Sequence, residues 1–292
     1  MRLANVEEHK LPQVDYSLAA CSYKYYPLKL GGLRMHPIEV RELVKTFGNI
    51  IAVNKLTFDV HEGEVYGLLG PNGAGKTTTL KVLMGLLDPD SGTANVFGIN
   101  SIYDPIEVKK RVGYVPEEQL LYNSLTSREI LEFVASVRGL DYYHTKNRVA
   151  EMARALDFTT HYDKPIVTLS QGNKQKAMLL IAMLHAPDLL ILDEPFSGLD
   201  VGNIRDVKRS FDLIQKDHEL NTIIYSTHEL RLAVELADSI YVVGYPTIDG
   251  VKQNYATIVK HYDLKAMGMA WTEFGQEHIK LITEIDATMM VS

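Results

Sequence analysis

Three short apolar runs stand out in the pattern of hydrophobic and polar positions: EVYGLLG at 64–70, LLILDEP at 189–195 and TIIYSTH at 222–228. Each is nearly continuous rather than alternating, which is typical of a strand covered on both faces of a sheet. The second and third runs each follow a segment with helical periodicity. Because strands that alternate with helices form parallel sheets, we predict a parallel α/β core.

Two other segments, 38–44 and 56–60, alternate between apolar and polar positions and are predicted to be half-buried strands. They are joined through Gly48 and Asn49, two residues that favour a turn. The pattern therefore predicts an antiparallel edge sheet beside the parallel core.

The stretch from 120 to 158 is mostly helical in its periodicity. Thr126 can cap the run SREILEFVASVRGL, and a second helix is predicted near 147–156. We therefore expect a folded domain over 35–245, in which a helical subdomain at about 117–179 is inserted between core segments at about 35–116 and 180–245.

The two ends of the chain differ from this domain. Residues 1–34 crowd several tyrosines together without a clear period, and they lack the apolar stretch of a secretory signal. We interpret them as a disordered extension or as residues that are not native, with Met35 as the true start; an ordered arm is the alternative. Residues 246–292 are interpreted as a C-terminal tail, in which Trp271 and Phe274 either pack on the core or contact a partner.

Composition narrows the function classes. The 292 residues are 46% hydrophobic and 23% charged, as in a globular protein, and no run approaches the roughly 18 apolar residues that a membrane span needs. A formal net charge of -7 gives no general attraction to nucleic acid, which we do not expect as a partner. Cys21 is the only cysteine, which excludes an intramolecular disulfide and suits a reducing cytosol.

The strongest local motif is GPNGAGKTT at 70–78, which follows a predicted buried strand and precedes a predicted helix. Its glycines let the backbone curl around phosphate, and the helix start adds its positive end. We expect Lys76 to reach the β and γ phosphates and the Thr77 hydroxyl to bind Mg²⁺. The predicted nucleotide-binding residues of this phosphate loop are Gly70, Pro71, Asn72, Gly73, Ala74, Gly75, Lys76, Thr77 and Thr78.

A second motif, LLILDEP, carries Asp193 to the carboxyl end of a buried strand, where open α/β sheets bind their ligands. Asp193 would hold Mg²⁺ directly or through water, and Glu194 would act as general base on the attacking water. The alternative is that the Asp-Glu pair only caps the next helix. The phosphate loop in the same chain favours the catalytic interpretation.

The order and spacing of these motifs, over about 38–243, resemble the nucleotide-binding subunits of ATP-binding cassette (ABC) proteins. The resemblance implies a P-loop NTPase fold with a RecA-like core and ATP and Mg²⁺ as cofactors. Phe47 stands where that family places an aromatic against adenine. In GYVPEE, Glu117 occupies a metal-sensing position that usually holds Gln.

The same resemblance assigns three later positions. Asp200 in FSGLD is the carboxylate of the loop that links two sites, and His228 is a γ-phosphate contact. LSQGNKQKA at 169–177, which by itself resembles a polar surface helix, corresponds to the family signature. There Ser170 and Gly172 are retained, while Gln171 and Asn173 depart from the usual LSGGQ. These donors would contact the ATP of a second subunit, so a homodimer or heterodimer is expected.

The signature variant and the GYVPEE loop look most like export-type subunits that serve multidrug, sodium or polysaccharide permeases. The resemblance thus implies ATP hydrolysis for a separate permease, with the protein peripheral on the cytoplasmic face of the cell membrane. Two alternatives stay open: a soluble ABC ATPase acting on ribosomes or DNA, and a degenerate cassette that binds ATP without turnover. The separation of 117 residues between Lys76 and Asp193 (193 − 76) leaves no room for a long coiled coil.

Overall fold

The computed structural model describes residues 36–216, 222–270 and 275–291. The predicted extension at 1–34 and the two aromatics Trp271 and Phe274 lie outside the described residues.

The centre of the fold is a six-stranded sheet in the order β12-β9-β3-β8-β7-β6. Five of the strands are parallel, and β12 pairs with β9 antiparallel at one edge. In register, β3 and β8 pair from Val65 with Ile223 to Leu69 with Thr227. The strand bounds are β3 Val65–Leu69, β6 Val112–Val115, β7 Leu189–Leu192, β8 Thr222–Thr227, β9 Ser239–Gly244 and β12 Thr257–Asp263.

The continuous apolar runs are explained by the two hydrophobic cores that this sheet separates. In β3, Val65 and Leu69 enter one core while Tyr66 and Leu68 enter the other. The other parallel strands alternate in the same way, so both faces require apolar side chains. The predicted parallel α/β core is therefore confirmed.

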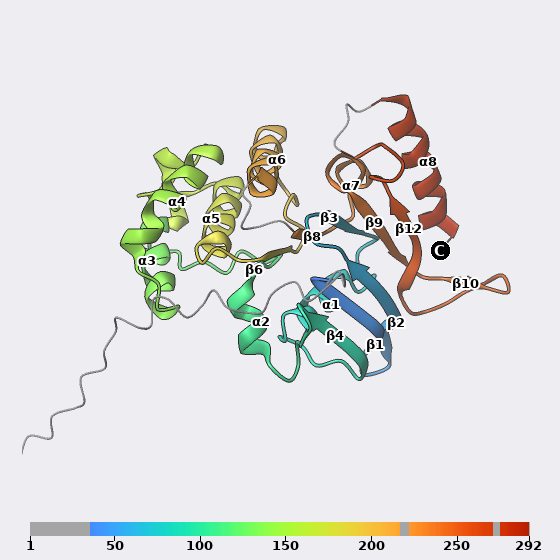
Figure 1. Cartoon of the computed structure of the whole chain (residues 1–292). Coiled ribbons are helices and arrows are strands. Elements are labelled where there is room, and N and C mark those ends of the chain that lie inside the picture. Colours follow the sequence, from blue (N-terminus) through green and yellow to red (C-terminus); the bar gives the residue numbers. More distant parts are fainter. Residues whose placement is uncertain (1–35, 217–221, 271–274, 292) are drawn as a thin grey trace, which may run out of the picture. The chain divides into compact units, whose positions relative to one another are not determined.

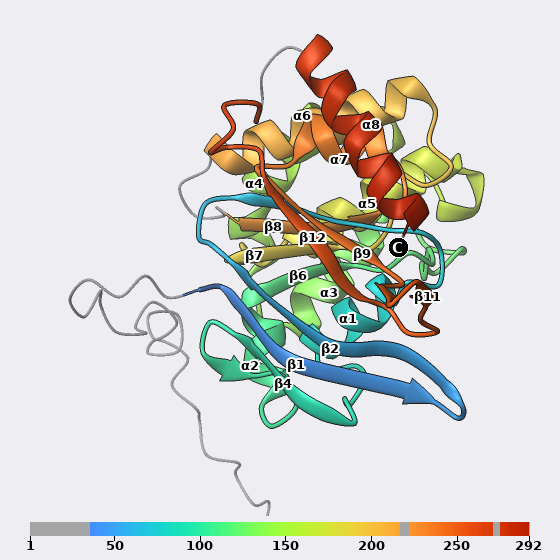
Figure 2. The same ribbon diagram turned by 90° about the vertical axis from the view of Figure 1, so that its right-hand side faces the viewer.

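Each face of the sheet has its own covering layer, as Figure 2 shows. Helices α6 Val201–Lys216, α7 Leu230–Leu236 and α8 Gln276–Val291 lie over one face. Helix α1 Lys76–Leu83 and the smaller antiparallel sheet lie toward the other face, together with α2 Pro105–Arg111. The phosphate loop thus emerges between the sheet and α1.

The predicted antiparallel edge sheet is present and longer than its pattern indicates. It has the order β2-β1-β4-β5, with bounds β1 Ile38–Phe47, β2 Ile50–Val60, β4 Ser91–Val96 and β5 Ile99–Asn100. The apolar alternation fails in the middle of β1 because the ladder shifts register between Val40 and Leu43, where Glu42 takes a φ of 49°.

The helical part groups α3 Ser127–Val137, α4 Tyr142–Ala155 and α5 Gln171–Met183, at the left of Figure 1. Thr126 caps α3 in a capping box with Glu129, as its sequence predicts. Helix α4 begins at Tyr142, earlier than the predicted Asn147, and short 3-10 turns at Thr159–His161 and Ile166–Thr168 lead into α5. The predicted subdomain limit at 179 falls inside α5, whose buried residues belong to the core under the main sheet.

The segment interpreted as a tail continues the main sheet. A short hairpin, β10 Thr247–Ile248 and β11 Val251–Lys252, leads into β12, and α8 follows. Only Tyr262 of β12 is buried, so this strand lacks the apolar run of the central strands. Among the described helices, none is both long and apolar enough to cross a membrane.

Candidate functional site

The phosphate loop follows β3 directly and is confined by neighbouring backbone. A methyl group built on Gly70 would lie 2.3 Å from the carbonyl oxygen of Val243. One built on Gly75, whose φ is 77°, would lie 2.6 Å from the carbonyl oxygen of Ala52. Close packing therefore requires glycine at both positions, and the backbone conformation requires it at Gly75 as well.

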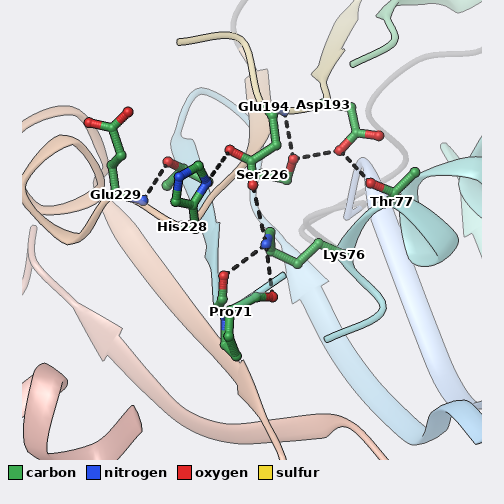
Figure 3. Close-up of polar contacts among 10 residues, drawn as sticks. Pro71, Lys76, Thr77, Asp193, Glu194, Ser226, His228 and Glu229 are labelled. Atoms are coloured by element: carbon green, nitrogen blue, oxygen red, sulfur yellow. Dashed lines mark hydrogen bonds and ion pairs between the residues drawn. The ribbon is translucent and has the colours of Figure 1, made fainter. Parts of the chain in front are cut away.

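Lys76 begins α1 and folds its side chain back over the loop, as Figure 3 shows. Its ammonium donates to the carbonyls of Gly70 at 2.8 Å and Pro71 at 3.2 Å, and lies 3.2 Å from Oε1 of Glu194. Both charged side chains are buried, with 5% and 7% of their surface exposed. No described residue donates a hydrogen bond to that Oε1, so the contact with Lys76 is electrostatic. Because a buried ammonium needs a counter-charge, Glu194 stabilises it here.

Asp193 follows β7 and is fully buried. Its Oδ1 accepts hydrogen bonds from the hydroxyls of Thr77 at 3.0 Å and Ser226 at 2.6 Å. Its Oδ2 is buried and accepts none from the described residues. Burial raises the pKa of the carboxyl, and the two hydroxyl donors oppose that shift in part.

Glu194 is held in an unusual backbone conformation, with a φ of 46°. Its amide donates to the Ser226 hydroxyl at 2.8 Å, and its Oε2 lies 2.9 Å from Nδ1 of His228. A non-glycine residue with its backbone in the left-handed region costs about 1 kcal/mol or more, and such a conformation persists only where the surrounding structure fixes it. The ends of β7 and β8 supply these fixing contacts.

Together these residues form one cluster at the carboxyl ends of β3, β7 and β8, which we call the phosphate cluster: Lys76, Thr77, Asp193, Glu194, Ser226 and His228. Its unshared Asp193 oxygen and Thr77 hydroxyl are hard oxygen donors, as Mg²⁺ prefers. The described residues hold no group of three or more His, Cys, Asp or Glu side chains fit for a metal. Mg²⁺ usually takes one or two protein carboxylates together with phosphates.

A second group of predicted residues lies at the starts of α5 and α6. Ser170 caps α5 by accepting from the Asn173 amide at 3.3 Å. A methyl group on Gly172 would lie 2.4 Å from the Asn203 side chain, so the two helix starts are in tight contact. Asp200 accepts from the amide and the side chain of Asn203, and these bonds hold its pKa below the usual value. We call Ser170, Gly172, Asp200 and Asn203 the signature group; among the described contacts none joins it to Lys76.

The polar appearance of LSQGNKQKA is misleading, because its side chains are not all on the surface. Gln175 and Lys176 are buried, and the Lys176 ammonium lies 2.6 Å from Asp206 of α6. Gln171, one of the departures from the family signature, directs its side-chain amide at the carbonyl of Ser197, 3.5 Å away. This helix is therefore tied to its neighbour along its first turns.

The remaining predicted residues lie outside the phosphate cluster and the signature group. Phe47 ends β1 with 49% of its surface exposed. Glu117 is exposed in the bend after β6. Its charge and that of Asp193 act on the buried hydroxyl of Tyr114, whose pKa is raised mainly by burial. In the loop, Asn72 is exposed, Ala74 is buried and Thr78 is half-buried on α1.

Ser226 and Asn203 were not among the residues predicted from the sequence. A signal existed for Ser226, because it precedes His228 by two positions and alternate residues of a strand point to one face. Asn203 had no comparable signal, since its contact with Gly172 joins two helices distant in sequence.

Comparison with known proteins finds ABC transporter ATP-binding proteins by family, by sequence and by structure. Residues 53–197 match the ABC transporter family. An ABC transporter ATP-binding protein of Methanocaldococcus jannaschii is 36% identical over 207 residues, covering 70% of this chain and 73% of that protein. The bacitracin transport ATP-binding protein BcrA of Bacillus licheniformis is 36% identical over 206 residues, covering 70% and 66%. A solved ATP-binding subunit of an ABC transporter is 28% identical, with a TM-score of 0.67 over 84% of this chain and 99% of its own.

Proposed function

Since this chain belongs to the ABC transporter family as an ATP-binding subunit with ATPase activity, we propose that it pairs with a second cassette subunit around two ATP molecules and drives a separate permease. We further propose that it acts at the cytoplasmic face of the cell membrane and that transport runs outward. The similarity to BcrA, described as a bacitracin transport ATP-binding protein, supports a transport role, and the LSQGNKQKA variant supports the outward direction.

The phosphate cluster suggests a role for each of its residues. The loop amides and Lys76 would bind the polyphosphate, and Thr77 and Asp193, assisted by Glu117, would hold Mg²⁺, which would neutralise phosphate charge when bound. Glu194 accepts the proton of the attacking water, and His228 orients that carboxylate from its other side. Phe47 packs against the adenine.

The observation that carries the dimer proposal is the separation of the signature group from the phosphate cluster. Ser170 and Gly172 present a capped helix start, which is an anion-binding feature, yet their described contacts lie with Asn173 and Asn203. A second subunit placed head to tail would bring one chain's signature group against the other's phosphate loop. ATP would then be part of the interface.

The dimer is tested with Glu194→Gln, which should retain ATP binding, lose turnover and accumulate an ATP-dependent dimer in analytical ultracentrifugation. Adding Ser170→Ala should reduce that dimer while ATP still binds the monomer. Ser136→Ala, an exposed serine of α3, is the matched control and should leave the dimer intact. Equal loss of monomer binding and dimer on Ser170→Ala would refute the role in trans.

The permease is tested by co-expression with the products of the neighbouring genes, among which we expect a membrane protein. A complex that survives detergent purification, with ATP hydrolysis faster than that of the isolated subunit, is the expected result. Co-purification with ribosomes or DNA instead would contradict transport and favour the soluble class.

A further inference from the structure

Tyr245 occupies a place at the phosphate loop that mirrors the place of His228. The sheet order β9-β3-β8 puts one strand on each side of β3, which runs into the loop. His228 follows β8 on one side, and Tyr245 follows β9, which ends at Gly244, on the other. The carboxyl ends of parallel strands share one edge of a sheet, so both residues flank the same loop.

The hydroxyl of Tyr245 lies against the most exposed part of that loop. A methyl group built on Gly73 would lie 3.4 Å from the hydroxyl oxygen of Tyr245, so the hydroxyl stands about one methyl group away from the glycine backbone. The exposed residues of the loop are Pro71, Asn72 and Gly73. Gly73 has a φ of 84°, which residues with a side chain rarely adopt. Within this tip the Pro71 carbonyl accepts hydrogen bonds from the Ala74 amide and the Lys76 ammonium, both at 3.2 Å, whereas Gly70 and Gly75 are pressed by neighbouring backbone.

The surrounding chain fixes Tyr245 independently of the loop. The Lys252 ammonium lies 5.8 Å from the centroid of its ring, and the Gln253 amide donates to the Pro246 carbonyl at 2.9 Å. Tyr245 is partly buried and packs against the hydrophobic core on the α1 side of the main sheet, as Ala52 does. The hairpin thus holds the phenol in place before any nucleotide contact is made.

We propose that Tyr245 is a positioning residue for ATP binding, which braces the phosphate loop at Gly73 and keeps its backbone arranged for polyphosphate. Pre-arranging a loop raises affinity because less conformational freedom is lost on binding. The attacking water and its base belong to the other flank, at Glu194 and His228. Tyr245 should therefore influence nucleotide affinity and leave the chemical step unchanged.

The experiment uses the full chain with two variants, Tyr245→Phe and Tyr245→Ala, and measures ATP and ADP binding by calorimetry and ATPase kinetics. We expect Kd and KM to rise about threefold for Phe and about tenfold for Ala, with kcat within about twofold of the parent. In the nucleotide-free chain, amide hydrogen exchange over 70–75 should become faster in both variants.

The matched control is Tyr255→Phe, since Tyr255 lies in the same segment and none of its described contacts reaches the loop. It should leave Kd, KM and exchange at parental values. Unchanged Kd and loop exchange in Tyr245→Ala would overturn the proposal, as would a fall in kcat with no change in Kd. The Phe variant keeps the ring, so it tests the hydroxyl contact even if Ala disturbs the hairpin.

Discussion

His228 and Glu194 are joined side chain to side chain across the ends of two adjacent strands, with Nδ1 of the imidazole 2.9 Å from Oε2 of the carboxylate. The other carboxylate oxygen lies 3.2 Å from the Lys76 ammonium. An ionised carboxylate only accepts hydrogen bonds, so Nδ1 is the donor when Glu194 is charged. Both oxygens of the proposed base are thereby oriented before substrate arrives.

The first prediction is that His228→Ala lowers kcat for ATP hydrolysis by about 100-fold while ATP affinity changes little, because Glu194 loses one of its two orienting contacts. Steady-state kinetics and equilibrium binding on the same preparation measure both. His61→Ala, which removes an exposed histidine, is the control and should retain parental turnover. Parental kcat in His228→Ala would contradict the assignment.

The second prediction concerns Ser226, whose hydroxyl links the Asp193 carboxylate and the Glu194 amide. Ser226→Ala should cost about 1–3 kcal/mol of unfolding free energy and lower kcat about tenfold or more, because a buried amide loses its acceptor and the base shifts. Ser101→Ala removes a buried hydroxyl bonded to the Val82 carbonyl. It should lower stability without lowering kcat, and matching kinetics in the two variants would argue against a role for Ser226 at the site.

The third prediction concerns the buried ion pair between α5 and α6, in which Lys176 and Asp206 expose 4% and 16% of their side chains. Asp206→Asn should cost about 3 kcal/mol, because the Lys176 ammonium stays buried without its nearest counter-charge. The double variant Lys176→Met with Asp206→Leu should recover most of that loss. Urea denaturation measures the free energy of unfolding of each.

The control for this pair is Glu277→Gln, which breaks the exposed pair with Lys280. Exposed pairs contribute little, so the loss should stay below about 1 kcal/mol. If Asp206→Asn costs no more than this control, the charge of Lys176 is not effectively buried.

The fourth prediction is a pH dependence set by His185. Burial, together with the nearby charges of Arg138 and Arg148, lowers its pKa from 6.5 to about 4, although its Nε2 bonds to the Val112 carbonyl. Between these values the unfolded chain binds more protons than the folded chain. The free energy of unfolding should therefore rise with pH across this window, by about 3 kcal/mol in total, and lose that contribution on acidification.

The check is urea denaturation of the parent and of His185→Gln at about pH 5 and about pH 7.5. The difference in unfolding free energy between the two pH values should shrink in the variant. His61→Gln, at an exposed position, should keep the parental difference. An unchanged difference in His185→Gln would show that this histidine is not the source.

The sequence predicts the parallel core well because its strands are apolar on both faces. The predictions weaken where one face is open. Strand β12 buries only Tyr262, and β1 loses its alternation at the register shift beside Glu42, so their extents could not be predicted from periodicity.

The residues of the candidate site also differ in how far the sequence predicts them. Lys76, Thr77, Asp193 and Glu194 lie in motifs whose chemistry is local, and the structure brings them together. The contacts of Ser226, Asn203 and Tyr245 each join elements far apart in the sequence, and only Ser226 had a local signal, its place two positions before His228. The roles of all these residues in catalysis stay predictions until the variants are measured.

Strand β12 has a consequence beyond completing the sheet. Its pairing with β9 runs from Gly244 opposite Thr257 to Ser239 opposite Asp263 and covers a strand whose six residues are all buried. A chain cut before Thr257 would leave one edge of SIYVVG unpaired, while its other edge stays paired with β3, and an exposed apolar edge can recruit strands from other molecules. Strand β12 thus also protects the protein against aggregation, and a chain that lacks it should first show reduced solubility.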